Sequence, residues 1–321
     1  MINKNSKIYI AGHRGLAGSA IVRELQRQGY ANLVTRTHAE LDLEDAVATQ
    51  QFFEQERPEL VFLAAAKVGG IHANNTYPVD FLMSNLLIET NICRAAHATK
   101  VNRLIFLGSS CIYPRDCPQP IKEEYLLTGP LEATNRPYAL AKIAGIEMCW
   151  SYNRQYGTKW LAAMPTNLYG PGDNYDLNNS HVLPALIRKM HEAKVADAQD
   201  VVLWGSGTPK REFLYVDDLA GALVFLVTLD DTRYDPLVES SRCPLINVGS
   251  GEDLTIRELA EKIAEVVGYQ GRFVQDTSKP DGTMRKIMDV SKISDLGWRA
   301  EIDLRRGIAM AYEDYLDGNK Q

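Results

Sequence analysis

The pattern of hydrophobic and polar positions is most regular in the first half of the chain. There, short apolar or β-branched runs alternate with amphipathic stretches whose apolar residues recur at helical spacing. The predicted strands cover 7–12, 32–37, 60–66, 103–110 and 159–172, and the predicted helices cover 17–30, 43–58, 79–99 and 138–157. Such alternation is typical of a parallel sheet with helices on both faces. We therefore expect an α/β fold with a doubly wound parallel sheet.

The alternation weakens after residue 172. The runs "VVLWGSG" and "EFLYVDDLAGALVFLVT" suggest a hairpin-like piece followed by a returning helix, and "PLINVGS" is a candidate to rejoin the sheet. A further helix is predicted over 255–268, because Thr255 and Glu258 at its start have capping-box spacing. The second half therefore predicts a smaller C-terminal α/β domain, assembled from segments that leave the first sheet.

Length and composition agree with two domains. The chain has 321 residues, of which 45% are hydrophobic and 24% charged, as in an ordinary globular protein with a sizeable core. We expect residues 1–170 plus about 215–250 to form a nucleotide-binding domain, and about 171–214 plus 251–321 to form a substrate-binding domain.

Charge and cysteine content exclude several functional classes. A net charge of −6 argues against a nucleic-acid partner, and five cysteines without a CxxC pair suggest neither a disulfide framework nor a metal site. No apolar run is long enough to span a membrane, and the first residues pass into a strand without a signal-peptide core. We expect a cytoplasmic protein.

The segment "GHRGLAG" is the first chemical signal. It places Gly12, Gly15 and Gly18 directly after the first predicted strand and at the start of the first predicted helix. Glycines at this spacing let backbone amides approach a pyrophosphate while the helix N-terminus faces the anion. We expect a Rossmann-type dinucleotide site here, with His13 and Leu16 also in contact with the cofactor; the alternative is a tight turn that serves packing alone.

The end of the second strand, "VTRTHAE", favours NADP over NAD. Arg36 and His38 stand where an acidic residue would bind the NAD ribose, and with Arg14 they could form a cationic pocket for a 2′-phosphate. The alternative for Arg36 and His38 is a solvated strand-end charge. Asp42 could bind the adenine amino group or cap the next helix.

A second signal is "YALAK", which puts Tyr138 and Lys142 on one helical face. A phenol has a pKa of about 10, and a nearby ammonium lowers it toward the range useful for acid–base catalysis. The lysine can also hold a ribose hydroxyl. Ser109 and Ser110 lie at the end of a predicted strand, in the crevice where such sheets bind ligands.

These motifs, in this order, resemble the extended short-chain dehydrogenases/reductases that act on nucleotide sugars. Further segments, among them "LGSSCIYP", "PTNLYGP", "WGSGTPKREFLYVDD" and "KPDGTMRK", extend the resemblance over essentially the whole chain. It implies epimerisation of GDP-4-keto-6-deoxy-D-mannose at C3 and C5, then reduction of the C4 ketone by NADPH to GDP-L-fucose. One departure is His38, where members of this family tend to carry arginine.

The resemblance gives a chemical meaning to the thiol in "GSSCIYP". A reductase needs only the tyrosine, serine and lysine, whereas epimerisation needs a base and an acid on opposite faces of the sugar. Cys111 fits the base if nearby cations lower its pKa, and His181 fits the acid. The alternatives are a buried small hydrophobe for Cys111 and a hydrogen bonder at a helix start for His181.

The same resemblance extends the binding sites. Further cofactor contacts are expected at Leu107, Gly108, Lys142, Pro165, Asn167 and His181. The GDP-sugar is expected at Asn167, Arg188 or Lys189, Trp204, Arg211 and Asp281, since guanidinium and ammonium groups suit phosphate oxygens and Trp204 can stack on guanine.

Two alternative functions and the oligomeric state remain to be tested. The rivals are a simple nucleotide-sugar epimerase or dehydratase with tightly held NAD, and a non-catalytic NADP-binding regulator. Apolar stripes on the helices near 79–99 and 138–156 predict a homodimer, formed by pairing these helices across a two-fold axis.

Overall fold

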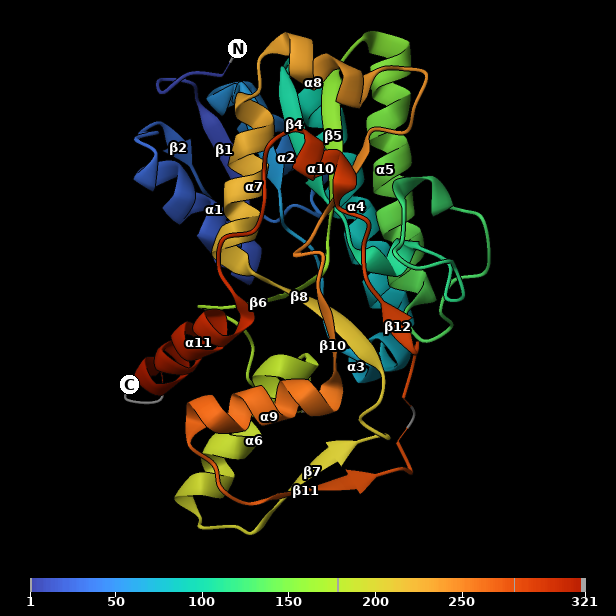
Figure 1. Cartoon of the computed structure of the whole chain (residues 1–321). Helices are drawn as coiled ribbons and strands as arrows, with labels where there is room; N and C mark the ends of the chain where they lie inside the picture. Colours follow the sequence, from blue (N-terminus) through green and yellow to red (C-terminus); the bar gives the residue numbers. More distant parts are fainter. Residues whose placement is uncertain (1, 178, 280, 319–321) are drawn as a thin grey trace.

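A computed structural model describes residues 2–177, 179–279 and 281–318 (Figure 1). Its centre is a six-stranded sheet with the order β2-β1-β3-β4-β5-β9, and every pairing in it is parallel. The strands are β1 (Ile8–Ala11), β2 (Leu33–Val34), β3 (Leu60–Leu63), β4 (Arg103–Leu107), β5 (Lys159–Pro165) and β9 (Leu245–Val248). The predicted doubly wound parallel sheet is confirmed, and "PLINVGS" does rejoin it as β9.

Helices cover both faces of this sheet, because successive strand residues point to opposite sides. On one side, Ile8 and Ile10 pack against α1 (Leu16–Arg27) and α7 (Val216–Thr228). On the other side, Tyr9 and Ala11 pack into a core with α2 (Ala46–Glu56), α4 (Pro78–Ala98) and α5 (Arg136–Tyr156). The central strands are therefore buried on both faces, which explains their nearly continuous apolar sequences.

Local signals set several helix ends as the sequence predicts. The capping box of Thr255 and Glu258 starts α9 (Ile256–Val267), and Gly157 ends α5 in the left-handed conformation, with φ +70°. Asp42 does not cap the next helix, which was the alternative to its role in adenine binding. The N-cap of α2 is Asp45, whose side chain accepts hydrogen bonds from the amides of Val47 and Ala48.

The remaining elements form a second body, which lies below the large sheet in Figure 1. Its core is packed between α6 (Val182–Val195), α9 and α11 (Leu304–Gly318). Two smaller sheets accompany these helices: β7 (Asp200–Trp204) with β11 (Arg272–Asp276), and β8 (Lys210–Tyr215) with β6 (Asn167–Tyr169), β10 (Asp253–Thr255) and β12 (Arg285–Lys286).

The expected hairpin in this region is wrong. β7 does not pair with β8; it pairs in parallel with β11, which comes much later in the chain. Val201 and Leu203 of β7 are buried in one core with α6 and α9, and Phe273 of β11 packs against the same core. The pairing therefore follows tertiary packing and not the turn after β7.

Shorter elements complete the chain: α3 (Ile71–Thr76), α8 (Asp231–Val238), α10 (Ser291–Asp295) and the 3-10 turns η1 (Ser110–Ile112) and η2 (Glu123–Tyr125). Within the described residues, no helix combines the length and the apolar character needed to cross a membrane.

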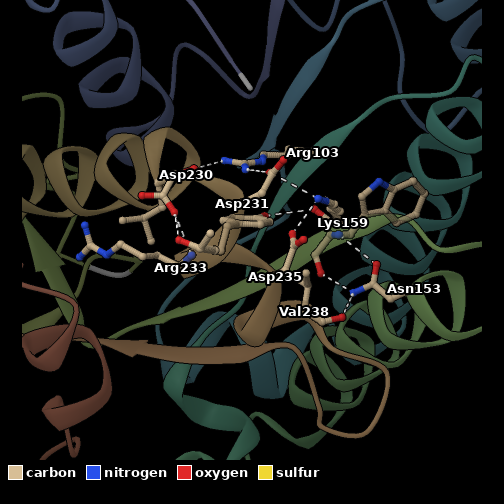
Figure 2. Close-up of polar contacts among 12 residues, drawn as sticks. Arg103, Asn153, Lys159, Asp230, Asp231, Arg233, Asp235 and Val238 are labelled. Atoms are coloured by element: carbon tan, nitrogen blue, oxygen red, sulfur yellow. Dashed lines mark hydrogen bonds and ion pairs between the residues drawn. The ribbon is translucent and has the colours of Figure 1, made fainter.

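A polar network holds α8 against the amino ends of β4 and β5 (Figure 2). Arg103, which is 1% exposed, donates to the carbonyl oxygens of Val227 and Leu229 and pairs with Asp231 at 2.8 Å. Lys159, the first residue of β5, pairs with Asp231 and with Asp235. Because these groups lie at the amino ends of the strands, the network stabilises the fold. It lies away from the carboxyl ends of the strands, where parallel sheets of this kind bind their ligands.

Candidate active site

The glycine loop lies at the carboxyl end of β1 and is held by close backbone contacts. Gly12 has φ +86°, and a Cβ atom there would lie 2.7 Å from the amide nitrogen of Ala65. At Gly18 a Cβ would lie 2.0 Å from the carbonyl oxygen of Gly12, so the helix start and the loop can touch only through glycine. Gly15 caps α1 without a side-chain hydrogen bond, which leaves the helix N-terminus to an anion.

The residues proposed for a 2′-phosphate gather at this edge, but not as isolated cations. Arg36 pairs with Glu56 at 2.7 Å and donates to the carbonyl oxygen of Thr35. Glu40, whose pKa is lowered first by a hydrogen bond from the Thr37 backbone, is also under the charges of Arg36 and Arg14. Both arginines therefore lie near enough to Glu40 to act on it electrostatically, and the sequence indicated neither Glu40 nor Glu56.

His38 and Asp42 form a separate exposed pair. The His38 Nδ1 atom lies 3.8 Å from an Asp42 oxygen, and their side chains are 83% and 51% exposed. His13 in the glycine loop is partly buried, and its Nδ1 atom has no hydrogen-bond partner in the described part of the chain.

Ser109, Tyr138 and Cys111 meet after the end of β4. The Ser109 side chain accepts from the Cys111 amide at 3.4 Å and caps η1, which buries Ser110 and Cys111. Burial, with added repulsion from Cys111 and Glu89, raises the pKa of Tyr138 well above its usual value, while a hydrogen bond with Ser109 opposes the rise. The expected lowering of this pKa is thus not observed; Tyr138 is held protonated, as a proton donor must be.

Lys142 lies one helical turn further along α5. Its Nζ atom is 4.7 Å from the Phe106 ring centroid and 5.9 Å from that of Tyr138. It forms an ion pair with Glu89 of α4 at 3.1 Å, in which both side chains are buried. The sequence gives no sign of Glu89, because an acidic residue in the middle of a helix usually belongs to a solvated face.

Cys111 is 7% exposed, and burial raises the pKa of its thiol. Lys286, a hydrogen bond with Ser109, and Lys142 act in the opposite direction but do not outweigh burial. The prediction that cations lie near Cys111 is therefore confirmed, but the predicted net lowering of its pKa is wrong, and the resting group is a thiol. Lys286 comes from β12, and only its place at the end of "KPDGTMRK" marked it in the sequence.

His181 starts α6 as its N-cap and is exposed, although the protein around it lowers the pKa of its imidazole. The preceding segment is attached to the loop that follows β3, where the Gly70 amide donates to the Asn179 carbonyl oxygen at 3.1 Å. A Cβ at Gly70 would lie 3.2 Å from the carbonyl oxygen of Ser180. His181 thus enters from the second body at the carboxyl edge of the large sheet.

Arg188 and Lys189, the two basic residues of α6 predicted to bind the GDP-sugar, contact different neighbours. Arg188 pairs with Glu192 at 2.7 Å and lines a cavity of about 390 Å³ together with Asp173 and Asp314. Lys189 is partly buried, and its Nζ atom lies 5.0 Å from the ring centroid of Trp204.

Trp204 is 57% exposed, and Lys279 also lies over its ring, at 5.3 Å from the centroid. Arg211 is partly buried, and burial lowers the pKa of its guanidinium, opposed by Asp281. Asp281 accepts from both the amide and the hydroxyl of Ser206, so its carboxylate holds the turn after β7.

The remaining candidates follow the ends of β4 and β5. At Gly108 a Cβ would lie 1.8 Å from the Met164 methyl group, so the strand ends are in close contact next to Leu107. Pro165 is the last residue of β5, and the Asn167 side chain donates to the Glu212 carbonyl oxygen at 2.7 Å. In the described residues, no three His, Cys, Asp or Glu side chains are grouped as a metal ion would require.

A glycine-cradled helix start and a serine–tyrosine–lysine set at the carboxyl edge of a doubly wound parallel sheet define a dinucleotide-dependent short-chain dehydrogenase/reductase. The chain belongs to the NAD dependent epimerase/dehydratase family, whose model matches residues 8–236.

Three similar proteins illustrate this membership. A putative GDP-L-fucose synthase 2 of Arabidopsis thaliana is 57% identical over 99% of this chain and 94% of its own length. The GDP-L-fucose synthase of Escherichia coli K12 is 56% identical over 97% of both chains. A solved structure of a GDP-D-glycero-L-gluco-heptose synthase from Campylobacter jejuni, in the presence of NADPH, aligns with a TM-score of 0.91. It is 39% identical, over 98% of this chain and 100% of that one.

Proposed function

We propose that this protein converts GDP-4-keto-6-deoxy-D-mannose to GDP-L-fucose by epimerising C3 and C5 and then reducing C4 with NADPH. The observation that carries the proposal is the position of the Cys111 thiol beside the Ser109–Tyr138 pair. A reductase needs no such thiol, whereas an epimerase-reductase needs a carbon base within the same pocket. The names of the Arabidopsis and Escherichia relatives support the same reaction.

The residues present fit NADPH. The uncapped start of α1 suits its pyrophosphate. Arg14 and Arg36 both lie near enough to Glu40 to lower its pKa and are proposed to bind a 2′-phosphate, with the Arg36 charge partly balanced by Glu56. When bound, NADPH supplies the hydride for C4. The heptose synthase that shares this fold was solved in the presence of the same cofactor.

Epimerisation is the task of Cys111 and His181. Hydrogens on carbons beside a ketone are acidic, and Cys111 removes one as a proton while Ser109 stabilises the enolate oxygen. His181 returns a proton to the opposite face, so each centre breaks one C–H bond and forms another. Lys286 and Lys142 both favour the thiolate that this step requires.

Reduction is the task of Tyr138. As hydride reaches C4, the oxygen there gains negative charge, and the protonated Tyr138 hydroxyl gives it a proton. Ser109 or Ser110 polarises the carbonyl, and the Lys142 ammonium stabilises the tyrosinate that remains. Cys111 and Tyr138 therefore perform separate chemistry on one sugar.

The nucleotide diphosphate is assigned to Lys189, Arg211 and Asn167, with guanine against Trp204. Arg188 is a weaker candidate, since its guanidinium already pairs with Glu192. On this assignment the second body, about 171–214 plus 251–321, is the substrate domain, and 1–170 plus about 215–250 is the cofactor domain. We also propose that the protein acts in the cytoplasm.

Assembly as a homodimer is part of the proposal. Val79, Met83 and Leu87, spaced four residues apart on α4, are 68%, 47% and 38% exposed, and Leu140 on α5 is 41% exposed. Because α4 and α5 pack side by side, these side chains can form one apolar face, and two copies would bury it as a four-helix bundle.

One assay tests the function directly. The purified protein should oxidise NADPH when given GDP-4-keto-6-deoxy-D-mannose, and chromatography should identify GDP-L-fucose as the product. An NAD-dependent epimerase or dehydratase would consume no NADPH overall, and a regulator would bind the cofactor without turnover. Reduction to an unepimerised sugar would place the protein among the GDP-sugar reductases that lack the epimerase step.

A further inference from the structure

The ion pair between Glu89 and Lys142 lies in the layer directly behind the active site. Glu89 comes from the middle of α4 and Lys142 from α5, and the Nζ and Oε1 atoms are 3.1 Å apart. The side chains are 0% and 1% exposed. Within the described residues neither carboxylate oxygen of Glu89 has a hydrogen-bond partner, so the contact with Lys142 is an ion pair. A lysine assigned to catalysis is thus paired with a carboxylate that no motif predicts.

The surroundings of this pair are otherwise uncharged. Lys142 lies against the rings of Phe106 and Tyr138. The titratable groups coupled to Glu89 are Lys142, Tyr138 and Cys149 on α5, and Cys93 on α4 itself. Burial raises the pKa values of the phenol and of both thiols, so these three groups are neutral at physiological pH. Among the described groups that act on Glu89, Lys142 is therefore the one of opposite charge.

A buried lysine without a counter-charge readily loses its proton. As a neutral amine, Lys142 could neither stabilise the tyrosinate left by proton donation nor bind a ribose hydroxyl as firmly. A carboxylate at 3.1 Å supplies a counter-charge and also fixes the direction of a long, flexible side chain.

We propose that Glu89 is a positioning residue for the reduction step, which keeps Lys142 charged and directed toward Tyr138. The inference rests on the proposed function. It assigns Glu89 no contact with substrate. It predicts that reduction depends more strongly on the Glu89 charge than proton exchange at C3 and C5 does, because Lys286 and Ser109 favour the Cys111 thiolate more than Lys142 does.

The test compares Glu89→Gln, which keeps the shape but removes the charge, with Glu89→Asp, which keeps the charge. Glu89→Gln should slow NADPH oxidation at least tenfold above neutral pH, as expected when the orientation and charge of a catalytic group are lost. Glu89→Asp should keep most of the rate. Deuterium uptake from heavy water into the sugar, measured without NADPH, should fall clearly less than reduction in Glu89→Gln, because Lys286 and Ser109 still favour the Cys111 thiolate.

The pH profile separates this role from a structural one. Burial raises the pKa of Glu89 to about 7, with Lys142 opposing, so the wild-type carboxylate takes up a proton below that pH. The Glu89→Gln and wild-type profiles for reduction should therefore converge below about pH 7 and diverge above it. Cys93→Ala removes a buried thiol one turn away on the same helix. It is the control for packing changes and should leave the pH profile unchanged.

Three results would overturn the inference: a wild-type profile in Glu89→Gln, equal losses in Glu89→Gln and Glu89→Asp, or loss of exchange in parallel with reduction. If the unmutated protein fails to oxidise NADPH with this substrate, the proposed function is wrong, and NADPH affinity then decides the role of Glu89. Glu89→Gln should weaken NADPH binding severalfold above neutral pH, and unchanged binding would reject the role.

Discussion

At the scale of single residues, mutation of Tyr138 and of Cys111 should affect different reactions. Tyr138→Phe keeps the ring but removes the proton, so reduction should fall about a hundredfold or more while exchange at C3 and C5 persists. Cys111→Ala should abolish deuterium uptake at those carbons and leave the cofactor bound. Cys111→Ser should rescue weakly, because a hydroxyl is a poorer base than a thiolate.

Mass spectrometry of the sugar recovered from heavy water without NADPH measures this exchange directly. Normal exchange at both carbons in Cys111→Ala would show that the thiol only fills space beneath η1.

Arg14 is the residue on which cofactor choice should depend most. Arg14→Ala should erode the preference for NADPH over NADH about tenfold or more, as expected from losing a charge-assisted contact of roughly 1.5–3 kcal/mol. Arg36→Ala should have a smaller effect, since Glu56 already balances part of that charge. Ratios of kcat/KM for the two cofactors measure the preference.

Arg23→Ala is the matched control for cofactor choice, because Arg23 lies on α1 and pairs with Asp217. Equal use of NADPH and NADH by the unmutated protein would reject the 2′-phosphate assignment.

At the scale of elements, the network in Figure 2 should determine how firmly α8 is held to the sheet. Arg103→Met leaves the Val227 and Leu229 carbonyl oxygens without their donor, which should lower the free energy of unfolding by about 3 kcal/mol. Lys159→Met should lower the free energy of unfolding clearly less, because the Lys159 side chain is 30% exposed. Urea unfolding followed by circular dichroism measures both.

Specific activity per folded molecule should stay unchanged in Arg103→Met, since the network lies at the amino ends of the strands. A stability equal to that of the unmutated protein would mean that water replaces the lost donor.

At the scale of the whole molecule, the exposed face of α4 should control assembly. The unmutated protein should be a dimer by light scattering at micromolar concentration, and Leu87→Lys should give monomers by placing a charge in the proposed bundle. Val195→Lys is the matched control, because Val195 is an exposed apolar residue, at 74%, on α6. A monomeric unmutated protein would reject the dimer.

The parallel sheet, its helices and the glycine loop could be predicted because each depends on signals within a few neighbouring residues. Apolar runs bounded by turns became β1, β3, β4 and β5, and the Thr255–Glu258 capping box started α9 as its spacing predicts. The order of glycine loop, strand-end serine and tyrosine–lysine pair along the chain was enough to indicate where the candidate chemistry lies.

Tertiary structure alone decided which distant segments meet and how deeply their side chains are buried. It paired β7 with β11, and it brought Lys286 to Cys111, Glu56 to Arg36 and Glu89 to Lys142. It also decided the protonation states of Tyr138 and Cys111, because burial raises the pKa of both groups, and in Cys111 it does so despite the charges of Lys286 and Lys142. The sequence determines the local elements, whereas pKa values and ion pairs depend on desolvation and on contacts between residues far apart in the chain, which no local pattern encodes.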